Sequence, residues 1–209
     1  MSNSLFITKT TKIDGRLENV FQRPTQKFSD ARKKEFLLGR SALNQSLFRM
    51  DQSFDLYPTF SRNSLPLLPM NVVGSISHKM SQAYAASAYK ADYRSLGVDI
   101  EFSKIATLMG KKILSSTEFE LIDDEEDGKS AKLALIFSSK ESFFKCAYPL
   151  VKTFFSFDAL VVKKINAESI DFELNLKKCP FLTELSRVEI KWHQDESFVY
   201  TRALLRQPS

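Results

Sequence analysis

The chain has 209 residues, of which 43% are hydrophobic and eighteen are Phe, and its formal net charge is +5. This length and apolar content are enough for one large domain or two small ones with a real core. The positive charge suits an anionic small molecule or an acidic protein partner. The sequence has no lysine-rich arm, no nucleic-acid-binding motif and no apolar run of about 18 residues, so we expect no nucleic-acid partner and no membrane span.

The cysteines and the amino-terminal residues bear on the compartment. Cys146 and Cys179 are the two cysteines, and neither belongs to a CxxC pair. This usage is typical of proteins in a reducing compartment. Residues 1–11 lack the apolar run of a signal peptide, so we expect a cytoplasmic protein.

The first part of the chain predicts a short strand and a loop over residues 1–28 and then a helix over residues 29–48. Ser29 or Asp30 can cap this helix, because short polar side chains accept hydrogen bonds from the first free N–H groups. Its apolar residues recur at helical spacing. They are Phe36, Leu37, Ala42, Leu43 and Leu47.

Prolines interrupt the chain after this helix, at Pro58 and in the segment from Pro66 to Pro69. We expect an irregular connection there. Three β-prone runs follow, and they predict strands at residues 72–77, 83–89 and 96–102.

The second part repeats the order of a helix followed by strands. A helical stretch near Lys104 and a short helix with Glu118 in its first turn precede an acidic run at 123–128, which we interpret as a solvated loop. The best helix covers residues 130–148 and ends at Pro149. Strands are predicted at 157–165, 170–177, 187–193 and 198–205. The repeated order predicts an α/β (α+β) fold of two similar halves, residues 1–102 and 103–209.

Two carboxylates stand two residues apart in the last strand of the first half. Side chains alternate along a strand, so Asp99 and Glu101 share one face and Ile100 is buried on the other. Two carboxylates on one face repel each other unless a cation lies between them, and Mg²⁺ takes oxygen ligands. Glu141 can supply a third carboxylate. A solvated strand face is the ordinary alternative.

The long helix carries a charged face. Glu141 and Lys145 are four residues apart and therefore neighbours on the helix surface, with Lys140 adjacent in sequence. A surface ion pair is the ordinary meaning of this spacing. Beside two strand carboxylates, the same face would offer a metal ligand, a base and cations for phosphate.

Four further side chains are candidates for phosphate binding. Arg32 and Arg40 are eight residues apart and can reach the same side of their helix, where a pair of Arg side chains can clamp a phosphate. His78 follows a strand, and Arg62 lies before the prolines. Each of these residues can equally be solvated.

Several common site motifs do not occur in the sequence. There is no Gly-rich phosphate loop, no GxSxG and no His/Cys metal spacing, and the chain has only six glycines. This argues against a P-loop enzyme and against a dinucleotide-binding Rossmann domain.

Five motifs in order resemble the 4′-phosphopantetheinyl transferases of the large, pseudo-dimeric type. The nearest subgroup is the enterobactin synthase component D branch, which is related to the surfactin-type enzymes. The motifs are Arg32-x₇-Arg40 with Ser41-Ala42, Pro66-x-x-Pro69, Gly74-Ser75-Ile76-Ser77-His78, Gly97-Val98-Asp99-Ile100-Glu101, and Phe137-Ser138-Ser139-Lys140-Glu141-Ser142-Phe143-Phe144-Lys145 followed by Tyr148-Pro149.

The resemblance implies a monomer made of two α/β halves, with the active site in the cleft between them. It implies transfer of phosphopantetheine from coenzyme A to a serine of an apo carrier protein, commonly acidic, which leaves adenosine 3′,5′-bisphosphate. It also favours siderophore biosynthesis of the enterobactin type, with other nonribosomal peptide or polyketide pathways open.

The resemblance also implies roles for residues that match the motifs. Asp99, Glu101 and Glu141 would hold Mg²⁺ on the coenzyme A pyrophosphate, and Glu141 would also be the base for the acceptor serine. Lys140 and Lys145 would approach the pyrophosphate. The remaining residues implied to contact coenzyme A are Arg32, Arg40, Arg62, Ser77 and His78.

Some positions depart from the family pattern. Leu68 precedes Pro69 where the family often has Trp, Lys79 follows the His, and Phe137 replaces a Trp. A catalytically lapsed member that binds coenzyme A or a carrier protein is therefore the alternative, although all three carboxylates are present. The run of residues 154–157 (Phe-Phe-Ser-Phe) fits either core packing, which we expect, or a carrier-docking surface.

Overall fold

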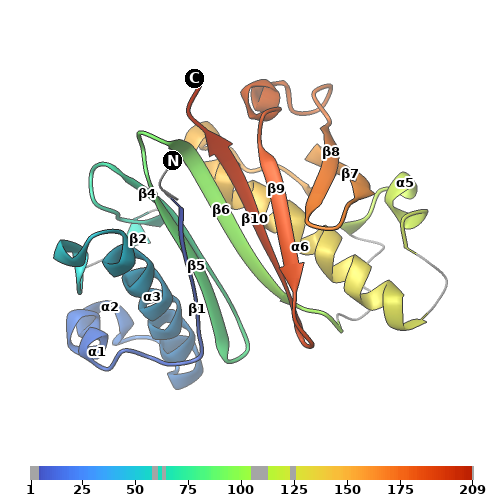
Figure 1. Cartoon of the computed structure of the whole chain (residues 1–209). Coiled ribbons are helices and arrows are strands. Elements are labelled where there is room, and N and C mark those ends of the chain that lie inside the picture. The colour runs from blue at the N-terminus through green and yellow to red at the C-terminus, as the bar shows by residue number, and fades with distance from the viewer. Residues whose placement is uncertain (1–4, 58–60, 63–64, 105–112, 123–125, 209) are drawn as a thin grey trace. The chain divides into compact units, whose positions relative to one another are not determined.

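The computed structural model describes residues 5–57, 61–62, 65–104, 113–122 and 126–208 (Figure 1). The chain divides into two compact units, Met1–Leu96 with Gln207–Ser209, and Gly97–Arg206. Each unit contains a sheet and a long helix, so the predicted mixed α/β fold is confirmed. The predicted boundary after residue 102 stays a prediction.

In the first unit, one long helix packs on a three-stranded antiparallel sheet. The strand order is β1 (Leu5–Thr10), β5 (Gln82–Tyr89) and β4 (Val72–Lys79). Helix α3 (Asp30–Met50) contacts all three strands. The core between them includes Leu38, Ala42, Leu43, Leu47, Val72, Ala83 and Ala85.

Helix α3 begins where the sequence predicts. The Ser29 side chain accepts a hydrogen bond from the Arg32 N–H at 3.3 Å, which satisfies one of the free donors of the first turn. Further along, a Cβ added to Gly39 would lie 3.0 Å from Cγ2 of Ile76. This glycine therefore lets α3 lie close to β4.

Residues 5–28 are more helical than the sequence predicts. After β1, the chain forms α1 (Arg16–Val20) and α2 (Gln22–Thr25). Leu17 and Phe21 are buried against Leu37 of α3. Helices of four or five residues are too short to show a helical period of apolar residues. Whether they form therefore depends on tertiary contacts. The short elements η1 (Gln52–Phe54), β2 (Ser61–Arg62) and β3 (Leu65–Pro66) follow.

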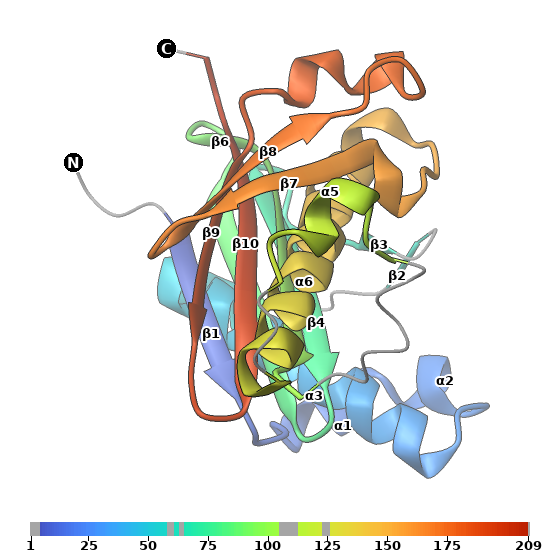
Figure 2. The same cartoon turned by 90° about the vertical axis from the view of Figure 1, so that its right-hand side faces the viewer.

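In the second unit, a long helix lies against one face of a five-stranded sheet (Figure 2). Helix α6 (Glu126–Val151) contacts the second and third strands of the order. That order is β6 (Tyr93–Phe102), β10 (Phe198–Arg206), β9 (Glu189–Gln194), β8 (Ser169–Leu174) and β7 (Leu160–Ile165). The unit also has α5 (Ser116–Phe119), η3 (Phe157–Ala159) and η4 (Pro180–Leu185).

Phenylalanine rings join the layers of the second unit. Phe143 of α6 is buried and lies 5.7 Å from Phe172 of β8 and 6.0 Å from Phe155, measured between ring centroids. Phe137 meets Phe157 at 5.6 Å. Large rings at these points fill the space between the helix and the sheet.

Helix α6 continues past the predicted end at Tyr148. Pro149 lies inside its last turn, and the helix ends at Val151. The Lys152 N–H donates to the Tyr148 carbonyl at 3.0 Å and closes that turn without the missing proline N–H. The helix expected near Lys104 falls largely on residues 105–112, outside the described residues. The acidic run at 123–128 is described only from residue 126 on, and there the predicted loop is wrong, because residues 126–128 form the first turn of α6. Within the described parts of the chain, no helix is long and apolar enough to cross a membrane.

Candidate functional site

Strand β6 meets helix α6 at Gly97, where backbone lies on backbone. A Cβ on Gly97 would be 2.0 Å from the Ser142 carbonyl oxygen and 2.5 Å from the Cys146 nitrogen, so no larger residue fits. Side chains alternate along the strand, and Asp99 and Glu101 therefore share the face of Gly97 that meets α6. Gly97 belongs to the sequence motif, but no role was predicted for it. An isolated glycine within a strand is nevertheless a sequence signal for a close backbone approach.

The two strand carboxylates are buried, and each has a donor. Lys145 of α6 donates through Nζ to Oδ1 of Asp99 at 2.6 Å, with side-chain exposures of 27% and 7%. Oε1 of Glu101 accepts from the Phe102 N–H at 2.8 Å. The predicted link between the strand carboxylates and the helix face is thus present as a direct ion pair.

Glu141 completes the carboxylate cluster electrostatically. Burial raises the pKa of Glu141, Asp99 raises it further, Lys145 lowers it, and Glu101 adds a smaller increase. These effects require the four side chains to lie near one another. Three carboxylates face one ammonium group, so the cluster, when ionised, carries an excess of negative charge that a cation would offset.

The donor set fits Mg²⁺ as a partial site. Among the described residues, no three His, Cys, Asp or Glu side chains already converge as a ready-made metal cage. Mg²⁺ is usually held by one or two carboxylates, with water and substrate phosphates filling its other positions. Asp99, Glu101 and Glu141 supply hard oxygen ligands of this kind, and a phosphate ligand would complete the set.

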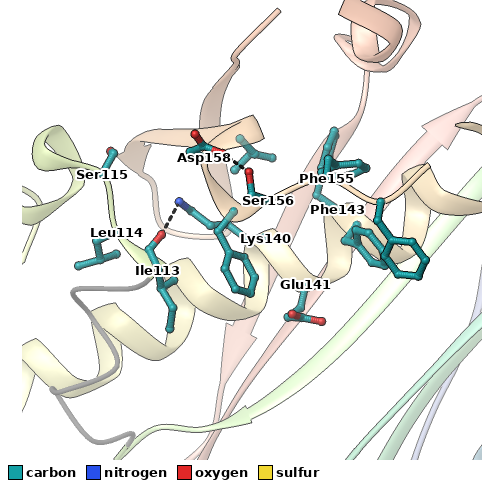
Figure 3. A pocket seen from close by; sticks show the side chains of 13 residues that line it. Ile113, Leu114, Ser115, Lys140, Glu141, Phe143, Phe155, Ser156 and Asp158 are labelled. Carbon is teal, nitrogen blue, oxygen red and sulfur yellow. Dashed lines mark hydrogen bonds between the residues drawn. The ribbon is translucent and has the colours of Figure 1, made fainter. Parts of the chain in front are cut away.

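A pocket of about 620 Å³ adjoins this cluster in the second unit. Figure 3 shows Glu141 and Lys140 leaving α6 in different directions, with Lys140 reaching toward Ile113. The remaining lining residues are mostly apolar. They are Leu114, Ser115, Phe143, Phe144, Phe154, Phe155, Ser156, Phe157, Asp158 and Leu160.

Lys140 forms a buried ion pair with Glu118, a residue for which the sequence predicts only a place in the first turn of a short helix. Its Nζ donates to Oε2 of Glu118 at 2.7 Å and to the Ile113 carbonyl at 3.0 Å, and the two charged side chains are 2% and 0% exposed. Burial lowers the pKa of Lys140, and the Glu118 carboxylate opposes this. The predicted contact of Lys140 with a pyrophosphate stays a prediction.

Glu118 also joins three segments of the second unit. Its carboxylate accepts the backbone N–H of Ser115 at 2.7 Å and that of Val162 at 2.8 Å. Ser115 and Glu118 form a capping box at the start of α5. The Ser-x-x-Glu spacing is a sequence signal for this cap, whereas nothing in the spacing indicates the ion pair with Lys140.

In the first unit, Arg40 and His78 lie beside the same turn of α3. Arg40 is 5% exposed, and its guanidinium lies 4.8 Å from the ring centroid of Phe36. Burial lowers the pKa of Arg40 to about 10, so the group remains charged at neutral pH. A Cβ on Gly39, which precedes Arg40, would lie 3.6 Å from Cδ2 of His78.

The other candidates of the first unit have different surroundings. Ser77 is buried in β4. Arg32 is exposed near the start of α3, 3.7 Å from Glu35, so the two arginines of the motif do not share one environment. Arg62 pairs with Leu65 in the short ladder of β2 and β3.

Two family models match the chain. The model of the 4′-phosphopantetheinyl transferase N-terminal domain matches residues 21–88, and that of the 4′-phosphopantetheinyl transferase superfamily matches residues 95–201. The chain belongs to the 4′-phosphopantetheinyl transferase superfamily. Its general activity is therefore phosphopantetheinyl transfer from coenzyme A to carrier proteins.

Two curated relatives that the chain matches have the same name. Enterobactin synthase component D of Salmonella typhi is 30% identical over 173 residues, which cover 81% of this chain and 70% of that protein. The protein of the same name from Escherichia coli O157:H7 is 35% identical over 119 residues, 56% of this chain and 55% of that protein. The chain thus spans about half the length of the second relative.

Solved structures of the superfamily resemble part of the chain. The holo-(acyl-carrier-protein) synthase of Bacillus anthracis in complex with CoA (3′,5′-ADP) is 17% identical, with a TM-score of 0.45, over 56% of this chain and 100% of that one. The Helicobacter pylori synthase in complex with coenzyme A is 18% identical, with a TM-score of 0.39, over 54% of this chain and 99% of that one.

Proposed function

We propose that this transferase moves the 4′-phosphopantetheine arm of coenzyme A to a serine of an apo carrier protein in a Mg²⁺-dependent reaction. The observation that carries the proposal is the cluster of Asp99, Glu101, Glu141 and Lys145 where β6 meets α6. Phosphoryl-type transfer depends mainly on positioning and charge neutralisation, and this cluster supplies groups for both.

The three carboxylates are the proposed metal ligands. Asp99 and Glu101 come from one strand face and Glu141 from the facing helix, so the packing of β6 on α6 supports this proposed set. When bound there, Mg²⁺ would offset charge on the pyrophosphate of coenzyme A. Lys145 holds Asp99 in place and can add a second positive charge.

The basic side chains are proposed to bind the phosphates of coenzyme A. Arg40 is charged and held on Phe36, which presents a pre-oriented planar donor set to a phosphate. His78 lies beside the same turn. Arg32, Arg62 and Ser77 are weaker candidates for the same role. For the pyrophosphate, the half-buried Lys145 is better supported than Lys140, two of whose donors already have buried acceptors.

Glu141 is the proposed base for the acceptor serine, directly or through water. The serine oxygen forms a bond to the phosphorus that carries the pantetheine arm, and the bond from that phosphorus to the other phosphate breaks. The serine proton passes to Glu141, and adenosine 3′,5′-bisphosphate leaves. The position of Glu141 on the pocket wall beside Asp99 and Lys145 supports this role.

Intact-mass spectrometry of apo carrier proteins tests the proposal. Incubation with the protein, coenzyme A and Mg²⁺ should add one phosphopantetheinyl group, and a chelator should prevent the gain. Unmodified carriers with coenzyme A still bound would instead support a lapsed member that acts as a binding module. The presence of all three carboxylates favours the enzyme.

The natural pathway is proposed to be siderophore biosynthesis of the enterobactin type. The two named relatives support this, and relative kcat/KM on aryl, peptidyl and acyl carrier proteins would test it. We also propose a monomer in the cytoplasm, where the buried thiols of Cys146 and Cys179 would stay reduced.

A further inference from the structure

A cluster of aromatic rings lies at the surface of the second unit. The aromatic patch consists of Phe144, Tyr148, Phe154 and Phe155, and Phe154 is 76% exposed. Phe144 lies 5.5 Å from Tyr148, 5.6 Å from Phe154 and 5.1 Å from Phe155, and Tyr148 lies 5.0 Å from Phe154, all between ring centroids. We expected residues 154–157 to pack in the core. This prediction is confirmed for Phe155, which packs against the core, and is wrong for Phe154.

Such a patch has the properties of a binding surface. Exposed apolar groups that cluster, rather than occur singly, mark sites of interaction. Rings that already stack on each other have little side-chain freedom left to lose, so a partner can bind them at a low entropic cost.

The patch is continuous with the pocket that contains Glu141. Phe144, Phe154 and Phe155 belong both to the patch and to the pocket lining, together with Glu141. Figure 3 labels Phe155 and Glu141 in this lining. A partner seated on the patch would therefore extend into the pocket that contains the proposed base. The carrier protein must present its serine to this pocket, so it must contact the surface around the pocket opening.

A lysine adds positive charge at the edge of the patch. Lys152 lies between Tyr148 and Phe154 in the chain, is exposed, and has φ of 54°, a left-handed conformation that favours glycine. An ammonium group here complements an acidic partner, which agrees with the net charge of +5.

We propose that the aromatic patch is the docking surface for the carrier protein and contacts apolar side chains of that partner. The inference rests on the proposed function, because it assigns the partner of the same site. Phe154 would be the anchor, since it is the most exposed Phe among the described residues and contacts two other rings of the patch.

Direct binding of an apo carrier protein tests the docking surface separately from transfer. Phe154→Ser should raise the Kd of the carrier about tenfold and leave the Kd of coenzyme A unchanged. Phe48→Ser is the matched control, because Phe48 is 42% exposed and lies on α3 of the first unit. Equal thermal unfolding midpoints would show that both variants fold.

Lys152→Gly separates binding from stability. Glycine adopts a positive φ without strain, so this variant should unfold at a higher temperature than the wild type. It should also bind the carrier more weakly, with less dependence on salt, because one attractive charge is lost. Unchanged carrier binding in Lys152→Gly would remove this charge from the docking surface.

The outcomes distinguish the docking surface from the proposed function. Equal carrier Kd values for wild type and Phe154→Ser, or no carrier binding by the wild type, would overturn the docking surface. A lower sedimentation coefficient for Phe154→Ser with unchanged carrier binding would assign the patch to a contact between copies of this chain. Carrier binding that depends on Phe154 without any mass gain would support the surface and refute the transfer.

Discussion

Helix α6 has two charged groupings with opposite character. On one side, Lys140 and Glu118 form a one-to-one ion pair that is almost fully buried, and backbone N–H groups fill the rest of the Glu118 carboxylate. On the other side, Lys145 pairs with Asp99, and both groups shift the pKa of Glu141, as does Glu101. Counted over these residues alone, the first grouping has one charge of each sign, whereas the second has three carboxylates and one ammonium group.

This difference teaches that two lysines of one motif, Lys140 and Lys145, can have separate physical roles. A balanced buried pair ties segments together and offers no net charge to a ligand. A carboxylate-rich cluster is stable only where a cation or protons offset its repulsion. The two groupings therefore predict different consequences for substitutions that look alike in sequence.

Of the substitutions considered, loss of Lys140 should have the largest effect, which is a decrease in the free energy of unfolding. Lys140→Met leaves Glu118 charged and buried, which should cost about 3–5 kcal/mol of unfolding free energy. Urea denaturation measures this cost. Lys145→Met is the matched control and should cost less, because Lys145 is partly exposed.

A double variant sharpens the same comparison. Glu118→Leu combined with Lys140→Met removes both charges and should recover much of the lost stability, because apolar residues can replace a buried pair. A single Lys140→Met variant as stable as the wild type would show that the ion pair does not hold the unit together.

Loss of Asp99 should mainly affect catalysis. Asp99→Asn removes a proposed metal ligand and the partner of Lys145, and should lower kcat/KM for transfer about 10²–10³-fold, or roughly 3–4 kcal/mol. The mass assay measures it, with the unfolding curve as the check on folding. Asp171→Asn, at an exposed position of β8, is the control. Undiminished turnover in Asp99→Asn would refute the assignment.

Gly97→Ala should disturb the junction on which the carboxylate cluster depends. A methyl group 2.0 Å from the Ser142 carbonyl oxygen must push β6 from α6, at a cost of about 1–3 kcal/mol. Transfer should fall with stability. In Gly128→Ala, where the added Cβ has no neighbour within 4 Å, stability should not fall. Equal behaviour of the two variants would contradict the close approach.

The smallest effect is expected in the first unit. Arg40→Lys keeps the charge but loses the planar donor fork, and should weaken coenzyme A binding about tenfold, or roughly 1.4 kcal/mol. Calorimetry measures the Kd. Arg49→Lys is the control, because Arg49 donates to the Ile7 carbonyl near the other end of α3. An unchanged Kd would remove Arg40 from the phosphate site.

Much of the fold could be predicted from local patterns. Apolar spacing and a capping serine predict the helix over residues 29–48, and apolar spacing predicts the strands of the first sheet. The structure confirms both. The helices α1 and α2 could not be predicted, because each is too short to show a period and depends on burial against Leu37.

The candidate site, too, could be predicted from the sequence only in part. The shared face of Asp99 and Glu101, and that of Glu141 and Lys145, follow from the periods of a strand and a helix. The sequence could not predict that Lys140 would pair with Glu118, 22 positions earlier, or that Arg40 would be buried on Phe36 while Arg32 stays exposed.

The sequence by itself determined the family and the candidate residues, because short motifs and side-chain periodicity are properties of neighbouring positions. The tertiary structure decided which charges are balanced and which aromatic rings stay exposed. The physical reason is that burial and pairing depend on segments far apart in the chain. Gly97 shows this directly, since a missing side chain acquires meaning only when α6 lies against it.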